Sequence, residues 1–144
     1  MNPTEQEIVL AALAWEKTPY RHQASTLNAG CDCLGLVRGV WRALYGSEPS
    51  SVPPYGRSAR DRRGAGQLIE AARHFLVETD REPAPGRVVL FRLHATLPPR
   101  HCGIILPESR FIHAQERVGV VVTGLDNIWL GRIDCVFAFP ERSQ

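Results

Sequence analysis

Hydrophobic positions recur at helical spacing in the first half of the chain and at strand spacing in the second half. The helical pattern covers three segments, at about residues 4–17, 33–45 and 68–76. Thr4 and Glu7 form a capping box at the start of the first segment, and Pro19 predicts its end because proline cannot continue a helix. The pattern therefore predicts three helices in this half.

The second segment carries the clearest signals of the three. Asp32 is a suitable N-terminal cap and Gly46 a suitable stop, whereas residues 19–31 before it resemble an irregular loop. Small residues recur every four positions along the segment, at Gly35, Gly39 and Ala43. This stripe predicts that the helix lies close against a sheet.

Short runs rich in β-branched and aromatic residues fill the second half. They cover residues 87–93, 102–106, 110–114, 118–123 and 132–139. Because helices come first and strands follow, the order predicts an α+β domain. Residues 47–64, rich in Pro, Ser, Gly and Arg, resemble one long surface loop. Its arginines are expected to form a solvated surface, with binding of an anionic polymer or another protein as the alternative: Arg57, Arg60, Arg62 and Arg63.

Size and composition narrow the class of protein. A chain of 144 residues fits one domain, residues 1–144, and its net charge of +2 is too small to indicate a nucleic-acid partner. No apolar stretch approaches the ~20 residues that cross a bilayer, so no membrane insertion is expected. Met1–Glu7 is acidic and unlike a secretory signal, so we expect synthesis in the cytoplasm without a signal peptide.

The run Gly30–Val37 carries the strongest chemical signal, because it places Cys33 in the first turn of the second helix, directly after Asp32. Unpaired backbone N–H groups and the positive end of the helix dipole stabilise a thiolate there. A thiolate is the form that attacks carbonyl carbon. Cys33 is therefore the candidate nucleophile.

Two histidines in the strand half are candidates for its base. A hairpin in which Leu106 lies opposite Arg110 brings the two runs together. In that register His101 and His113 share one face of the sheet as diagonal neighbours. Successive residues alternate between the faces, so Cys102 points away from them and into the core. Chemistry then makes His101 the base that takes the proton of Cys33 and later protonates the leaving amine. His113 orients His101, and the backbone N–H of Cys33 supplies one donor of an oxyanion hole.

A zinc site is the alternative use of these side chains. Its ligands would be drawn from Cys31, Cys33, Cys102 and His101. One residue between Cys31 and Cys33 is tighter than the usual spacing of zinc ligands, and adjacent His101 and Cys102 face opposite sides of a strand. We therefore expect no metal and no cofactor.

Several ordered segments resemble the NlpC family of bacterial and phage cell-wall cysteine peptidases. The family pattern Asp-Cys-Ser-Gly-Leu-Val stands here as Asp32–Val37, and its His-Val-Gly-Ile stands as His101–Ile104. The pattern Ile-His-Ala stands at Ile112–Ala114. The family's Pro-Gly-Asp-Leu-Val-Phe strand resembles Pro85–Phe91, and its Pro-Tyr element matches Pro19–Tyr20.

The resemblance implies a papain-like fold, with N-terminal helices packed on an antiparallel sheet of about five strands. It implies Cys33, His101 and His113 as catalytic residues. It also implies that Tyr20 and Asp32 bind substrate, Tyr20 at the oxyanion hole or against the peptide and Asp32 at a substrate amine. The implied substrate is the peptidoglycan stem peptide, commonly cut between D-glutamate and a diamino acid.

The amino-acid sequence of Gly30–Val37 further resembles that of the peptidases of phage tails and gene transfer particles. This resemblance implies tail-tip or hub proteins as partners. It also implies a protein that a tail carries to the periplasm or cell wall of a target cell. Leu34 stands where the family usually has Ser, which leaves open a structural or docking component of the tail with little activity. Hydrolysis at the muramyl link, or acyl transfer, would use the same three catalytic residues.

Overall fold

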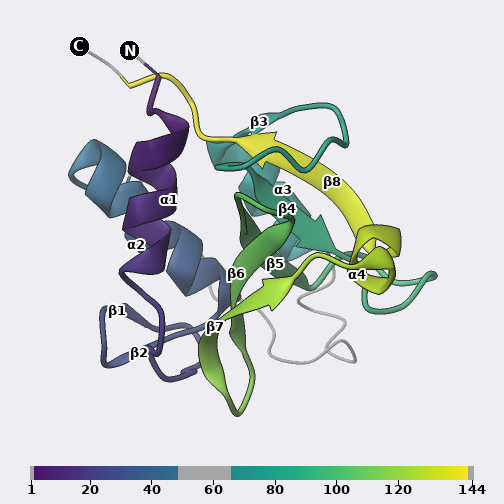
Figure 1. Cartoon of the computed structure of the whole chain (residues 1–144), viewed down its shortest axis with the longest axis horizontal. Helices are drawn as coiled ribbons and strands as arrows, with labels where there is room; N and C mark the ends of the chain where they lie inside the picture. The colour runs from purple at the N-terminus through teal and green to yellow at the C-terminus, as the bar shows by residue number, and fades with distance from the viewer. Residues whose placement is uncertain (1, 49–65, 143–144) are drawn as a thin grey trace.

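The computed structural model describes residues 2–48 and 66–142. The described chain forms the helices α1 (Glu5–Leu13), α2 (Cys33–Tyr45), α3 (Gln67–Phe75) and α4 (Asn127–Gly131). It forms the strands β1 (Ser25–Thr26), β2 (Gly30–Cys31), β3 (Val77–Glu78), β4 (Val88–Phe91), β5 (His101–Leu106), β6 (Arg110–Gln115), β7 (Gly119–Gly124) and β8 (Ile133–Ala138). Figure 1 shows α1 and α2 packed together to one side of the strands. Most of the predicted long loop, including its four arginines, lies outside the described residues.

The strands assemble mainly into one antiparallel sheet, in the order β3-β8-β4-β5-β6-β7. Strands β4 to β8 are the five predicted from sequence, so the α+β prediction is confirmed. The sequence pattern missed β3, which pairs Val77 with Ala138 of β8, and it missed α4. It also missed the β1–β2 pair, in which Ser25 lies opposite Cys31 within the segment predicted as irregular. All of these elements are too short to show a hydrophobic period.

Helix α1 begins as predicted but ends at Leu13, not near residue 17. The Thr4 hydroxyl accepts a hydrogen bond from the Glu7 N–H at 3.1 Å. Beyond Leu13 the chain turns, and Lys17 adopts a φ of 75°. The Lys17 N–H then donates to the carbonyl of Val120 in β7 at 2.9 Å. A distant strand therefore ends this helix, and no local pattern could have shown it.

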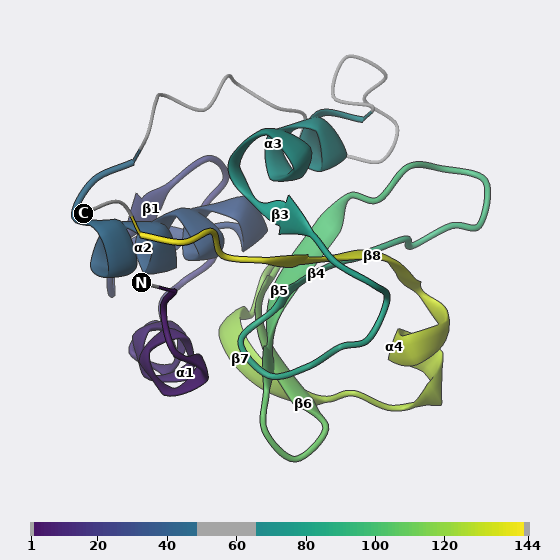
Figure 2. The ribbon, with the colours of Figure 1, turned by 90° about the horizontal axis from the view of Figure 1, so that it is seen from above.

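Both faces of the sheet are buried, and helices α1, α2 and α3 cover one of them. The buried side chains on that face include Leu36, Val40, Leu90, Cys102, Ile104 and Phe137. The other face buries Val89, Phe91, Ile105, Phe111, Ile133 and Val136. Figure 2 shows α1 and α2 on one side of the sheet and α4 on the other. Because residues alternate between the faces, His101 and Cys102 lie on opposite sides, as predicted.

The small residues of α2 pack close to other partners than the predicted sheet. A Cβ added to Gly39 would lie 1.9 Å from a ring carbon of Trp15, which follows α1. A Cβ added to Gly35 would lie 1.9 Å from the carbonyl oxygen of Ala24. The prediction of close packing is right, but its partners are the indole of Trp15 and the loop before β1. They occupy these gaps because α2 turns its branched apolar side chains toward the sheet.

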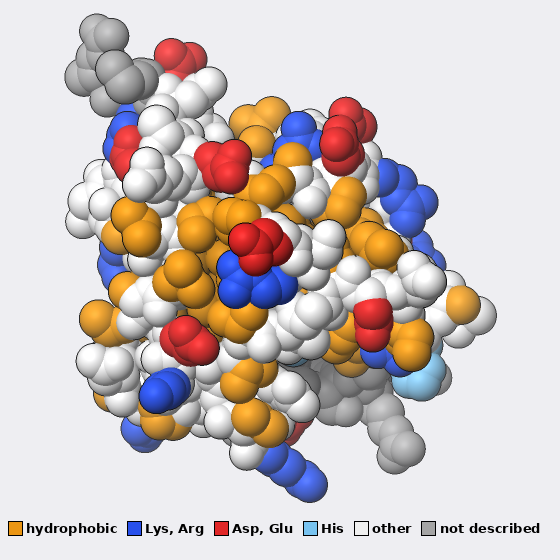
Figure 3. All heavy atoms as spheres, viewed as in Figure 1, with side chains coloured by type: hydrophobic (Ala, Val, Ile, Leu, Met, Phe, Trp, Pro, Cys, Tyr) orange, Lys and Arg blue, Asp and Glu red, His pale blue; other side chains and the backbone are white. Residues whose placement is uncertain are grey.

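The outer surface mixes charges of both signs. On the face drawn in Figure 3, acidic and basic side chains are interspersed among apolar ones. Arg142 pairs with Glu7, with 2.7 Å between Nη1 and Oε2, and ties the C-terminal segment to α1. Within residues 2–48 and 66–142, no helix combines the length and the apolar character needed to cross a bilayer.

Candidate active site

Cys33 is the first residue of α2, and a buried carboxylate holds this helix end in place. Asp32 is 1% exposed, and its Oδ1 accepts from the Gly35 N–H at 2.7 Å. Its Oδ2 accepts from the Gln23 N–H at 2.7 Å and lies 3.8 Å from His22 Nδ1. Asp32 thus caps the helix and joins it to the preceding loop. Its predicted contact with a substrate amine stays a prediction.

The surroundings of Cys33 favour its thiolate. Interaction with the Cys102 side chain is the largest cause that lowers the pKa of Cys33. Interaction with His101 and with the Cys102 backbone N–H lowers this pKa further. These interactions outweigh burial and hold the pKa of Cys33 well below its usual value. The sequence placed Cys102 correctly in the core but missed this interaction.

The two histidines meet through the predicted hairpin. Strands β5 and β6 pair Leu106 with Arg110, which is the expected register. The Nε2 of His101 lies 2.7 Å from the Nδ1 of His113. A Cβ at Gly103 would lie 3.3 Å from that of His113, so the glycine leaves room for the second imidazole. The structure therefore brings Cys33, His101 and His113 together.

A threonine that the sequence analysis missed completes this chain of hydrogen bonds. The Nε2 of His113 lies 2.8 Å from the Oγ1 of Thr123 in β7. When His101 is an imidazolium, the Nε2 of His101 donates a hydrogen bond to the Nδ1 of His113. The proton of the neutral His113 ring then sits on the Nε2 of His113. Burial and the charge of His101 lower the pKa of His113 to about 3, so this ring stays neutral. The alternation of β7 was the one signal that could have found Thr123, because it lies diagonally across from His113.

An aromatic wall on the same face of the sheet holds the histidines. The ring of Phe111 lies 4.5 Å from that of His113, and the ring of Phe91 stacks 6.1 Å from that of His101. Trp129 of α4 lies 5.5 Å from His113. The sequence analysis missed this wall, since its members come from strands and a helix far apart in the chain.

A cleft of about 480 Å³ opens over the site. Its lining residues are Tyr20, Cys33, Leu93, Arg100, His101, His113, Ala114, Gln115, Glu116 and Trp129. Tyr20 therefore lines the same cleft as Cys33, and its contact with substrate stays a prediction. Arg100, Gln115 and Glu116 carry no motif of their own, and only the fold brings them to the cleft.

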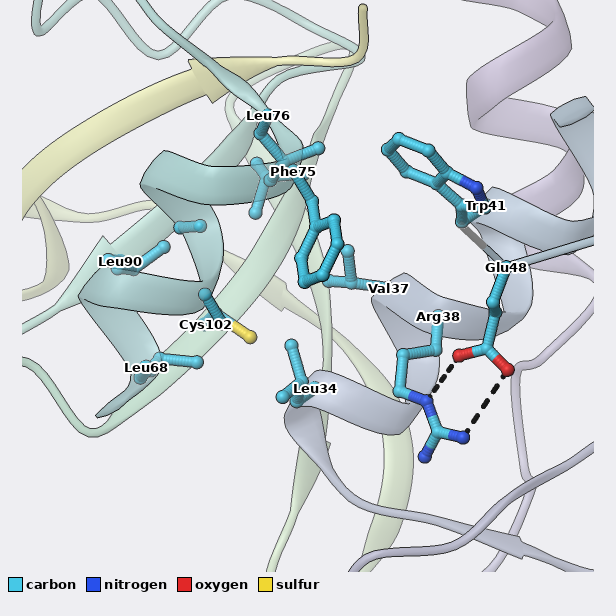
Figure 4. Close-up of a pocket in the computed structure, with 13 residues that line it drawn as sticks. Leu34, Val37, Arg38, Trp41, Glu48, Leu68, Phe75, Leu76, Leu90 and Cys102 are labelled. Carbon is cyan, nitrogen blue, oxygen red and sulfur yellow. Dashed lines mark hydrogen bonds and ion pairs between the residues drawn. The ribbon is translucent and has the colours of Figure 1, made fainter. Parts of the chain in front are cut away.

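Leu34 points elsewhere, into a separate apolar pocket between α2 and α3. Figure 4 shows it close to the sulfur of Cys102, with Leu68 and Phe75 nearby. A serine hydroxyl at this position would meet these apolar side chains. The apolar surroundings therefore suit Leu34 better than the serine that the family pattern has at this position.

Metal ligation was the alternative use of these residues. Across residues 2–48 and 66–142, no group of three or more His, Cys, Asp or Glu side chains is arranged to hold a metal ion.

Comparison with known proteins decides the family. A model of the NlpC/P60 family matches residues 17–136, a span that contains Cys33, His101 and His113. The chain belongs to the NlpC/P60 family.

Solved NlpC/P60 structures share the fold. The NlpC/p60 domain of the peptidoglycan hydrolase SagA superimposes with a TM-score of 0.65 at 18% identity, covering 95% of this chain and 100% of that one. An NlpC/P60 protein of Bacillus cereus ATCC 10987 does so with a TM-score of 0.66 at 13% identity, covering 96% and 41%.

Two similar proteins come from Escherichia coli K12. The murein DD-endopeptidase MepS/murein LD-carboxypeptidase is 30% identical over 112 residues, which is 78% of this chain and 50% of that protein. The probable endopeptidase NlpC is 28% identical over 116 residues, which is 81% of this chain and 65% of that protein. The chain therefore spans about half the length of the first relative.

Proposed function

We propose that this NlpC/P60 chain is a cysteine peptidase that hydrolyses amide bonds in peptidoglycan stem peptides. The observation that carries the proposal is that Cys33, His101 and His113 line one cleft, with 2.7 Å between the His101 Nε2 and the His113 Nδ1. Two similar proteins, a murein endopeptidase and a peptidoglycan hydrolase, support the substrate class.

The geometry supports a two-step reaction. The Cys33 sulfur attacks the carbonyl carbon, and the developing oxyanion accepts a hydrogen bond from the Cys33 backbone N–H. The imidazolium of His101 gives its proton to the leaving amine, and a thioester remains. Neutral His101 then takes a proton from water, which hydrolyses the thioester and restores the thiolate. His113 accepts from the His101 Nε2 and holds the ring in place.

The bond we propose lies between D-glutamate and a diamino acid. Stem peptides carry carboxylates and amines, and the cleft offers both signs of charge through Arg100 and Glu116. We assign Tyr20 a contact with the substrate or with the oxyanion, because it lines the cleft together with Cys33.

Mass spectrometry of defined muropeptides tests this proposal. Each muropeptide is incubated under reducing conditions with the wild-type chain and with Cys33→Ala. We expect new fragments that disappear with the variant, and their masses identify the bond. No cleavage, combined with slow alkylation of Cys33, would instead support a structural or docking component of a tail. Fragments from the muramyl link would redirect the assignment of the bond.

We also propose that a phage-like tail carries the protein to its wall substrate. The support is the sequence of Gly30–Val37, which resembles peptidases of such particles. Sedimentation of particles from producing cells, followed by immunodetection, should find the protein with the tail fraction. Finding it mainly in the periplasm without any particle would contradict this delivery.

A further inference from the structure

Cys102 is a second thiol in the core region against which Cys33, the candidate nucleophile, packs. It follows His101 in β5, where the family pattern has valine, and only 1% of its surface is exposed. Its side chain leaves the sheet on the helix side, and Figure 4 shows its sulfur directed toward Leu34, the residue after Cys33. Cys33 itself packs against the core cluster that contains Cys102.

The two cysteines belong to one packed region. Cys33 packs against the buried cluster that contains Cys102, and Leu34 and Cys102 line the same pocket. Interaction with the Cys102 side chain is the largest cause that lowers the pKa of Cys33. The arrangement is asymmetric, because Cys33 is half-buried at the cleft whereas Cys102 lies behind it in the core. A small oxidant in the cleft therefore reaches Cys33 first, and the neighbouring thiol is already in place.

We propose that Cys33 and Cys102 form an oxidative modification site, in which a peroxide converts the pair into a reversible disulfide that blocks the nucleophile. The Cys33 thiolate attacks the O–O bond of the peroxide, which is reduced and leaves as hydroxide, and a sulfenic acid forms on Cys33. The Cys102 sulfur loses its proton and displaces the sulfenic oxygen as water. In total two thiols and one hydrogen peroxide give one disulfide and two waters.

Electrostatics favours this order of events. The contact with charged Cys33 is the largest cause that raises the pKa of Cys102 well above its usual value. A sulfenic acid on Cys33 is neutral, so the first oxidation removes that charge and eases deprotonation of Cys102. Cys102 thus stays a protonated donor in the reduced protein and becomes a nucleophile only afterwards.

Peptide mapping of the wild-type chain tests the site without any assay of activity. The chain is treated with one equivalent of hydrogen peroxide, blocked with N-ethylmaleimide and digested with trypsin without reductant. Cleavage after arginine yields peptides 22–38 and 101–110, the first with Cys31 and Cys33 and the second with Cys102. We expect these peptides linked through Cys33, two hydrogens lighter than their sum, with Cys31 carrying the maleimide. A Cys31–Cys33 link, or sulfinic Cys33 beside a blocked Cys102, would overturn the proposal.

The loss of activity rests on the proposed function, whereas the cross-link does not. If muropeptides are cleaved, peroxide should abolish cleavage by the wild type, and dithiothreitol should restore most of it. Cys102→Val should recover little of its own starting activity after the same treatment, because its sulfenic acid oxidises further. Equal recovery by both proteins would overturn the role of Cys102. A cross-linked chain that cleaves no muropeptide would refute the proposed function and leave the site intact.

Discussion

Single residues set the positions of the protons in this site. His101 lies between Cys33 and His113, and His113 in turn bonds to Thr123. Each ring can orient its neighbour only if its own proton sits on one particular nitrogen. The hydroxyl of Thr123 is the acceptor that selects the Nε2-protonated form of His113.

Thr123→Val should therefore disturb catalysis without changing the shape of the strand. We expect kcat/KM on a cleaved muropeptide to fall about 10-fold, the effect of one lost hydrogen bond, and Thr123→Ser to restore most of it. Long-range ¹H–¹⁵N spectra should show mixed tautomers of His113 in Thr123→Val and the Nε2-H form in the wild type. A valine variant with the wild-type tautomer and rate would show that Thr123 serves packing alone.

His113 also links stability to pH. Its pKa falls from 6.5 to about 3 on folding, so below pH 6.5 the unfolded chain binds a proton that the folded chain does not. The free energy of unfolding should therefore decrease as the pH falls from 7 to 4.5. We expect the wild type to lose up to about 1.4 kcal/mol per pH unit relative to His113→Gln. Urea unfolding of both proteins measures this difference, and parallel pH curves would contradict it.

At the scale of elements, helix α2 holds Cys33 in place through close packing at two of its glycines. The Trp15 ring occupies the space beside Gly39, and the Ala24 carbonyl occupies the space beside Gly35. The second contact holds the loop that also bonds to Asp32 through Gln23. The helix start, the cap and the loop thus form one packed unit around Cys33.

Gly39→Ala should destabilise the fold despite the better helix propensity of alanine. The propensity favours alanine by ~1 kcal/mol, but the added Cβ would lie 1.9 Å from the indole, and overpacking costs about 1–3 kcal/mol. We expect a net loss of up to about 2 kcal/mol in urea unfolding. Gly131→Ala is the matched control, because no heavy atom lies within 4 Å of its added Cβ. Equal effects of the two substitutions would show that Trp15 is not the obstacle.

At the scale of the whole molecule, one sheet separates and supports two cores. Trp15 belongs to the core on the helix side, and Trp129 packs against the core on the other side. Strands β4, β5 and β6 contribute alternate residues to both cores. Loss of packing in either core would therefore expose one face of the sheet on which the other core also packs.

The described fold should consequently unfold as one cooperative unit, as expected for a single domain. Two variants test this: Trp41→Phe with Trp129→Phe leaves Trp15 as the reporter, and Trp15→Phe with Trp41→Phe leaves Trp129. Within each variant, urea midpoints from fluorescence and from far-UV circular dichroism should coincide. Separate midpoints for the Trp129 reporter would show that the second core unfolds independently.

Where the controlling interactions are local, the sequence was sufficient. The cap at Asp32 and the stop at Gly46 define α2 because they act within one helical turn. The register of β5 and β6 follows from a short connection and the alternation of residues, and it placed His101 beside His113. These local rules, together with motif resemblance, were enough to predict the fold class and to select Cys33 and His101 as the candidate nucleophile and base.

Only the tertiary structure decided which distant residues complete the site. Sheet order and helix packing bring Thr123, Trp129 and Cys102 to the site. Neither the order of strands in a sheet nor the packing of helices produces a periodic pattern of hydrophobic residues in the sequence. The end of α1 and the strand β3 likewise depend on hydrogen bonds to β7 and β8. Local patterns report the conformation of a segment, because backbone hydrogen bonding and side-chain alternation repeat along it. Contacts between segments depend on which buried surfaces fit together, and that is settled only when the whole chain packs.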